Sequence, residues 1–184
     1  MENKLSDLAF SIETECGCNE RSVVLRALRD SARDFCIDSE SWIGNFVYAI
    51  DPDLNIYDGA GTEDGRVYRL LSVSVSKDSV RYYGSLHDYR LLRDGSVYVN
   101  RGFLNHGDYV HIKTVLMPTP ESENIPEWLL LRHRDGLIYG ACSRICRQIG
   151  KPWFSMELSE RYRMRYLQEV TFAIEHSAEG DFQG

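Results

Sequence analysis

The hydrophobic period of this 184-residue chain changes twice along its length, and this change constrains the fold more than any other feature. Before residue 40 and after residue 126, apolar residues recur every three or four positions, as they do on one face of a helix. Between those segments they recur at every second position, which is typical of strands with one face in a core. The pattern therefore predicts an α+β fold in which a β-domain interrupts a helical one.

Three segments have the period of an amphipathic helix: residues 20–38, 126–149 and 156–178. We therefore expect a three-helix bundle, with a shorter helix over residues 3–15 before it. The apolar stripe that should bury the first long helix comprises Val24, Ala27, Leu28, Ser31, Phe35 and Cys36. Asn19 suits the N-cap of that helix, because its side-chain oxygen can accept a bond from the first free N–H groups.

The second and third helices carry start and stop signals of their own. Pro126 suits a first helical turn, where its missing N–H costs nothing, and Gly150 suits a helix end. Ser155 is expected to cap the third helix. The small residues Gly136 and Gly140 should let another helix approach the second one closely. The stripe that should bury the third helix comprises Leu158, Tyr162, Tyr166, Val170, Ala173 and Ile174.

The alternating segment contains four runs with the period of a strand. These runs are residues 46–50, 71–76, 96–99 and 109–116. The pair Asp94-Gly95 between two runs predicts a hairpin with a type I′ turn, which requires positive φ. We expect an antiparallel β-sheet or sandwich domain over residues 41–118, inserted between the first and second helices of a bundle domain formed by 1–40 and 119–184.

Charge and cysteine usage narrow the class of protein. The formal net charge is −7, which argues against a protein that grips nucleic acid or an anionic membrane through a basic face. No stretch approaches the roughly 20 apolar residues that a membrane span needs, and Met1 to Leu8 has no apolar run typical of a signal peptide. The cysteines are five, an odd number, which favours folding in a reducing compartment.

Motifs for catalysis are missing from the sequence, so we expect neither an enzyme nor a cofactor. It has no Gly-x-Ser-x-Gly elbow, no His-Glu-x-x-His and no P-loop. Cys142 and Cys146 share a helical face and, with Cys16 and Cys18, have the donor set of a four-thiolate zinc site. The simpler interpretation is that they are small core residues, because free cysteine is among the most buried residue types.

Tyrosines gather in the alternating segment and allow three interpretations. Tyr82, Tyr83 and Tyr98 have the ring faces that a platform for sugars or bases needs. They also suit cross-strand packing with the hydroxyl in water. A subunit interface is the third alternative, because tyrosine and arginine are enriched there.

Several segments together are similar to one protein family. The run Ala27 to Cys36, followed by Trp42, resembles the opening helix and tryptophan of the head-to-tail adaptor (tail tubular protein A type) family of tailed bacteriophages. A strand that ends at Leu116-Met117-Pro118, and then Ile125-Pro126-Glu127-Trp128-Leu129, resemble the last hairpin and the next helix entry. Gly150-Lys151-Pro152-Trp153 before the last helix is the most specific match. The similarity extends from about residue 20 to 178.

The resemblance implies a virion structural protein that is assembled in the host cytoplasm and located in the neck of the phage. Such proteins form a ring, typically of twelve copies, beneath the portal protein. Their C-terminal segment docks on the portal, and their β-domain meets the downstream tail (nozzle) protein. Double-stranded DNA passes through the ring without specific binding, and no membrane is involved.

Five residues are our candidates for the partner interfaces that this role requires: Arg161, Arg165, Phe182, Tyr82 and Tyr83. Two other classes of function stay open. In the first class, the β-domain is a binding module for sugar or peptide. In the second class, the chain is a thiol enzyme or a zinc protein. Another phage neck or completion protein with similar helices is a further alternative.

Overall fold

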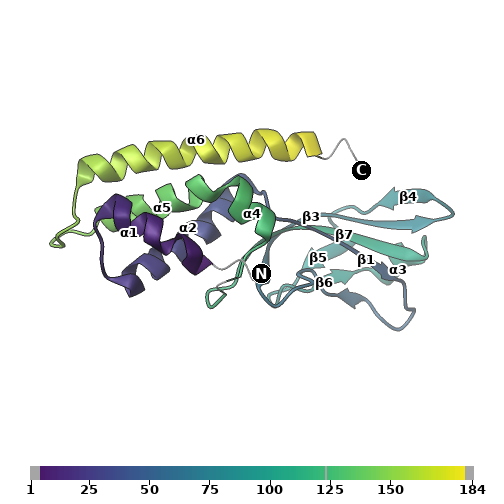
Figure 1. The fold of residues 1–184 in the computed structure, drawn as a ribbon. Coiled ribbons are helices and arrows are strands. Elements are labelled where there is room, and N and C mark those ends of the chain that lie inside the picture. Colours follow the sequence, from purple (N-terminus) through teal and green to yellow (C-terminus); the bar gives the residue numbers. More distant parts are fainter. Residues whose placement is uncertain (1–4, 123, 181–184) are drawn as a thin grey trace. The chain divides into compact units, whose positions relative to one another are not determined.

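The computed structural model describes residues 5–122 and 124–180, with side chains up to His176. The fold is mixed α+β, with antiparallel strand pairing. The chain divides into two compact units (Figure 1). The helical unit comprises Met1–Ser41 and Pro118–Gly184, and the β unit comprises Trp42–Met117.

The helical unit is built on three long segments that pack along one another. Its elements are η1 (Leu5–Leu8), α1 (Ala9–Cys16), α2 (Arg21–Ser39), α4 (Glu127–Arg132), α5 (Arg134–Cys146) and α6 (Met156–Gly180). Helix α5 packs against both α2 and α6, and Figure 1 shows α6 running beside it. The stripe predicted for α2 is confirmed, because all six of its residues are buried. Among the described helices, none combines the length and apolarity needed to cross a bilayer.

The N-terminal ends of the helices agree only in part with the residues predicted for them. Asn19 is not the N-cap of α2, which is Glu20, and the backbone carbonyl of Glu20 accepts bonds from the N–H groups of Val23 and Val24. Ser155 does cap α6, because its Oγ accepts a bond from the N–H of Leu158 at 3.3 Å. The short helix predicted over 3–15 begins as the 3-10 turn η1, and its positions 3 and 4 lie outside the described residues.

The helix predicted over residues 126–149 is broken in two, so that prediction was wrong. His133 leaves the helical conformation, with φ −121° and ψ 23°, and separates α4 from α5. Its buried ring lies 5.2 Å from the ring of Phe35 on α2 and 6.2 Å from that of Trp128. Pro126 precedes α4 as its N-cap, and α5 ends at Cys146 rather than at Gly150.

Two glycines allow the helices to approach closely, as predicted. A Cβ atom added at Gly136 would lie 2.6 Å from Cε2 of Phe35. One added at Gly140 would lie 2.9 Å from the ring of Tyr166 and against Oγ of Ser31. Helix α5 can therefore contact α2 and α6 through its backbone only where it carries glycine.

The β unit consists of two sheets around one apolar core. A four-stranded sheet has the order β1 (Ile43–Ala49), β7 (Tyr109–Pro118), β3 (Gly65–Lys77) and β4 (Val80–Tyr83). A three-stranded sheet has the order β2 (Ile56–Tyr57), β6 (Val97–Val99) and β5 (Tyr89–Leu91), and the short helix α3 (Arg101–Leu104) follows β6. Both sheets and α3 contribute to the core, which includes Val73, Val99, Phe103 and Ile112.

The hairpin between β5 and β6 is present, but its turn is not type I′. Only Gly95 has positive φ, at 89°, whereas a type I′ turn needs two such residues. The N–H of Gly95 donates to the carbonyl of Leu92, and the N–H of Leu92 donates to the carbonyl of Ser96. These bonds define a three-residue loop that ends in a left-handed glycine, the next most common hairpin connection.

Candidate functional site: the polar face of the helical unit

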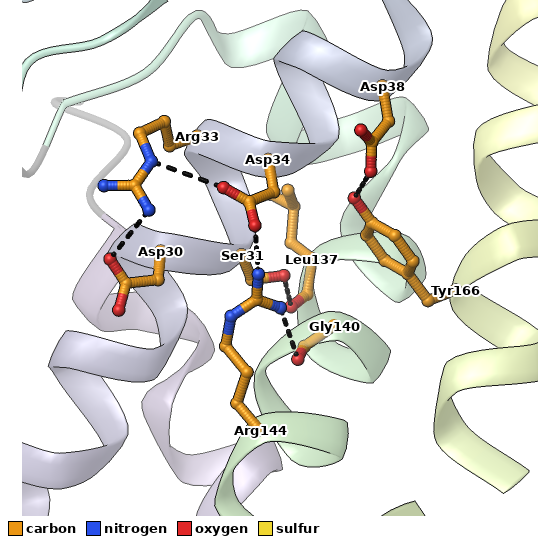
Figure 2. Close-up of polar contacts among 9 residues, drawn as sticks. All are labelled: Asp30, Ser31, Arg33, Asp34, Asp38, Leu137, Gly140, Arg144 and Tyr166. Atoms are coloured by element: carbon orange, nitrogen blue, oxygen red, sulfur yellow. Dashed lines mark hydrogen bonds and ion pairs between the residues drawn. The ribbon is translucent and has the colours of Figure 1, made fainter. Parts of the chain in front are cut away.

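A chain of charged side chains joins α2 to α5 (Figure 2). The guanidinium of Arg144 on α5 forms an ion pair with Asp34 on α2 and donates to the carbonyl of Gly140 at 3.1 Å. Asp34 also accepts a bond from Nε of Arg33 at 3.3 Å, and Arg33 pairs with Asp30 at 3.4 Å. Because these side chains are about a third exposed, the network orients Arg144 more than it stabilises the fold.

Two hydroxyl groups that lie deeper in the unit connect α2 with α5 and α2 with α6. Oγ of the buried Ser31 donates to the carbonyl of Leu137 at 2.8 Å. The hydroxyl of Tyr166 on α6 donates to Asp38 on α2, also at 2.8 Å (Figure 2). Burial, and then the bond to Asp38, raise the pKa of Tyr166 well above its ordinary range. The tyrosine is therefore a constant donor, and the relative position of α2, α5 and α6 is fixed by polar contacts as well as by packing.

The cysteines lie in the core of the helical unit. All five are free and buried. The thiol of Cys16 lies beside those of Cys142 and Cys146, so three of the four proposed zinc ligands are neighbours. Burial raises the pKa of Cys146 to about 12 and that of Cys36 to about 12. Within the described part of the chain, no three histidine, cysteine, aspartate or glutamate side chains are arranged to hold a metal ion.

The outer side of the network borders a hollow of about 510 Å³ on the helical unit. Arg144, Arg147 and Arg163 line it, together with Asp38 and Tyr166. Arg147 pairs with Glu160 at 3.1 Å. A surface hollow with three guanidinium groups has the chemistry to bind an anion through charge-assisted bonds.

The two arginines predicted as interface residues have different environments. Arg161 is exposed, and within the described residues it forms no hydrogen bond or ion pair. Arg165 is half-buried, with its Cζ 5.3 Å from the ring centroid of Tyr139, so it already has a contact inside the unit. Phe182, the third C-terminal candidate, lies outside the described residues.

The predicted tyrosines are only partly brought together. Tyr82 and Tyr83 on β4 are exposed and line a shallow depression with Phe103 and His106. Tyr98 does not line it, since it lies on β6, where the guanidinium of Arg90 is 5.0 Å from its ring centroid. The structure thus contains a two-tyrosine depression instead of the three-tyrosine platform considered from the sequence.

Helix α6 has an exposed apolar stripe that was not predicted from the sequence. Tyr162, Tyr166, Val170 and Ala173 are buried as predicted, but Ile174 is 48% exposed. Met164 and Leu167 are also exposed, at 59% and 44%. These three residues, spaced three and seven apart, share one helical face beside the buried one, and we name them the α6 outer stripe. The helical spacing of the three residues was the signal available in the sequence.

No protein-family model matches the chain, and no curated protein matches it at a significant level.

Proposed function

We propose that the chain is a structural subunit of a phage head-to-tail adaptor, which forms a ring that links the portal to the tail. In this proposal the helical unit is the bundle that packs around the ring and docks on the portal. The β unit, inserted between the helices, meets the downstream tail protein. Two observations support the proposal: the resemblance in sequence and the α6 outer stripe. The proposal depends mainly on the α6 outer stripe.

The α6 outer stripe is what a contact between copies would bury. Met164, Leu167 and Ile174 are each about half exposed on a helix of 25 residues. Burying one such side chain fully contributes about 1.5–3 kcal/mol. The three therefore contribute to a contact between copies, but further buried surface is needed to offset the cost of association, about 4–15 kcal/mol. Contiguous apolar surface of this kind marks interaction sites in soluble proteins.

A ring also needs a second, different surface on each subunit, since its contacts are heterologous. Exposed apolar side chains are present on other parts of the helical unit: Phe10 and Leu131 are each 74% exposed, and Ile149 is 84% exposed. In the proposed ring, the α6 outer stripe of one copy packs on such a surface of the next. The negative net charge suits a passage for DNA, because like charge keeps DNA from adhering to the wall.

The test is assembly on the portal. We expect the purified chain to be monomeric or weakly associated alone and to form a ring beneath portal rings from the same genome, visible by electron microscopy. The pair Leu167→Glu and Ile174→Glu should abolish the ring while leaving the helical content unchanged. The matched control is Gln168→Glu, an exposed position on α6 that lies outside the stripe. A chain that never associates with portal rings would contradict the proposal.

A second candidate function is a binding module, and the depression lined by Tyr82 and Tyr83 favours it. Its volume of about 520 Å³ accommodates one sugar or aromatic side chain. Titration with mono- and disaccharides, followed by tyrosine fluorescence and repeated with Tyr83→Ala, distinguishes the two candidates. Saturable binding that Tyr83→Ala removes would favour the module over the ring subunit.

A further inference from the structure

Three hollows on the surface of the helical unit adjoin one another. The hollow of about 510 Å³ shares Arg144 and Gln148 with a second one of about 340 Å³. The second shares Arg26 and Asp30 with a third one of about 170 Å³. They therefore form one continuous depression along α2, α5 and α6, which we name the arginine groove.

The groove concentrates positive charge in a chain that is negative as a whole. Six arginines line it: Arg26, Arg29, Arg33, Arg144, Arg147 and Arg163. Asp30 and Asp38 are the carboxylates among its lining residues. Neighbouring Asp34 and Glu160 pair with Arg33, Arg144 and Arg147, so the excess positive charge comes from the arginines without such a pair. More than a quarter of the 21 basic residues thus lie along a single depression, although the formal net charge is −7.

The arginines differ in whether they already form hydrogen bonds or ion pairs within the protein. Arg144 is held by Asp34 and by the carbonyl of Gly140, so its position in the middle of the groove is fixed. Arg26 and Arg163 line the hollows to either side, and neither forms a hydrogen bond or ion pair within the part of the chain that the structure describes. The groove therefore has one oriented guanidinium flanked by two that are available to a ligand.

Apolar side chains lie among the polar ones in the lining and favour a peptide over nucleic acid. Leu167 and Tyr166 line the first hollow, Val23 and Ala27 the second, and two prolines the third. An extended peptide that alternates carboxylate and apolar side chains matches both the arginines and this lining. A DNA duplex presents a phosphate backbone without apolar side chains, so it leaves this part of the lining unmatched.

We propose that the arginine groove is a docking site for an extended acidic segment of a partner protein, whose carboxylates pair with Arg26, Arg144 and Arg163. This inference goes beyond the proposed function, because it applies equally to a chain that forms no ring. Since part of the attraction is between exposed charges, binding weakens as salt increases.

The experiment uses the full chain and a short fluorescent peptide of alternating glutamate and leucine, with anisotropy as the readout. Saturable binding is expected, and the double substitution Arg26→Glu and Arg163→Glu should weaken it by about tenfold or more, the effect of losing one charge-assisted bond. The control substitution Arg132→Glu reverses an exposed charge on α4 outside the groove and should have little effect. Circular dichroism verifies that all variants are folded.

Three outcomes would overturn the inference. The first is equal binding of the matched lysine–leucine peptide, which would show an apolar site without selectivity for charge. The second is tighter binding of a short DNA duplex than of the acidic peptide. The third is a loss of affinity in Arg132→Glu as large as that in the double variant, which would show dependence on net charge instead of on the groove.

Discussion

The helices of one unit and the turns of the β unit satisfy polar side chains over different distances along the chain, although Thr114 in the β unit also bonds to a carbonyl 55 residues away. In the helical unit, Ser31 bonds to a carbonyl 106 residues away, and Tyr166 bonds to a carboxylate 128 residues away. In the β unit, Asp58, Asp88 and Asp94 accept bonds from backbone N–H groups two or three residues distant. The first kind of bond fixes how helices lie against one another, whereas the second kind shapes a single turn.

This difference predicts which substitutions should destabilise each unit. The packing of α2, α5 and α6 depends on a few contacts between distant residues, so removing one affects the whole unit. The β unit depends on its core and ladders, and its turn residues act locally. The two units should therefore respond unequally to similar substitutions, and four predictions test that inequality, from the largest expected effect to the smallest.

The largest effect is expected at Gly140, where α5 contacts both neighbouring helices. Gly140→Ala places a Cβ against Oγ of Ser31 and the ring of Tyr166, so it should lower the free energy of unfolding by about 3 kcal/mol. Urea denaturation measures the change. Gly102→Ala in the β unit is the control, because the nearest atom would be 3.3 Å away and the cost should be small. Equal losses would contradict the comparison.

Alkaline pH should destabilise the helical unit first. Burial raises the pKa of Cys36 and of Cys146 from 9.0 to about 12, so the unfolded state loses these protons before the folded state does. The stabilisation by these thiols is complete below pH 9 and is lost as the pH rises from 9 to 12. Cys36→Ala should reduce this slope in denaturation measured from pH 8 to about 10.5.

Hydrogen exchange assigns the alkaline effect to one of the units. All five cysteines belong to the helical unit, so amides of α2 and α5 should lose protection, relative to those of β3 and β7, as the pH rises above 9. An identical slope in wild type and Cys36→Ala would show that the thiols do not cause the change.

The stability that a buried long-range bond contributes can be compared with that of an exposed bond within one turn. Ser31→Ala removes the buried bond to Leu137 and should cost about 1 kcal/mol. Asp94→Ala removes an exposed bond within one turn and should cost less than about 0.5 kcal/mol. Thermal denaturation of the two variants measures the difference. A larger loss for Asp94→Ala would reverse the proposed order.

The smallest effect is expected for the ion pair between Arg147 and Glu160. The two side chains are about half exposed, so solvent and salt screen the attraction. A double-mutant cycle with alanine should give a coupling energy below about 0.5 kcal/mol. A coupling of more than about 2 kcal/mol would show that long-range charge pairs stabilise the helical unit as strongly as its buried bonds do.

Much of the fold followed from hydrophobic period, because period depends only on which face of an element is buried. The stripe of α2 and the alternation in β7 were predicted for that reason. Local patterns did not reveal the break at His133, whose ring contacts Phe35 on another helix. They did not reveal the type of turn at Asp94-Gly95 either, since several turns accept Asp-Gly. The exposure of Ile174 was missed because two apolar faces of α6 adjoin.

The candidate site was less predictable than the fold. Arg144 and Asp34 are 110 residues apart, and nothing in either segment indicates the other as its partner. Asp34 joins the ion-pair network through Arg33 on its own helix and Arg144 on another. The arginine groove likewise combines residues from α2, α5 and α6, so it exists only once the helices are assembled.

The most direct test of the ring-subunit proposal is the particle mass of the full chain, measured by mass photometry with and without purified portal rings. The proposal predicts a single small species without portal and, with portal, a complex heavier by the mass of a closed ring of subunits, typically twelve in the family that the sequence resembles. A chain whose mass distribution is unchanged by portal would contradict it.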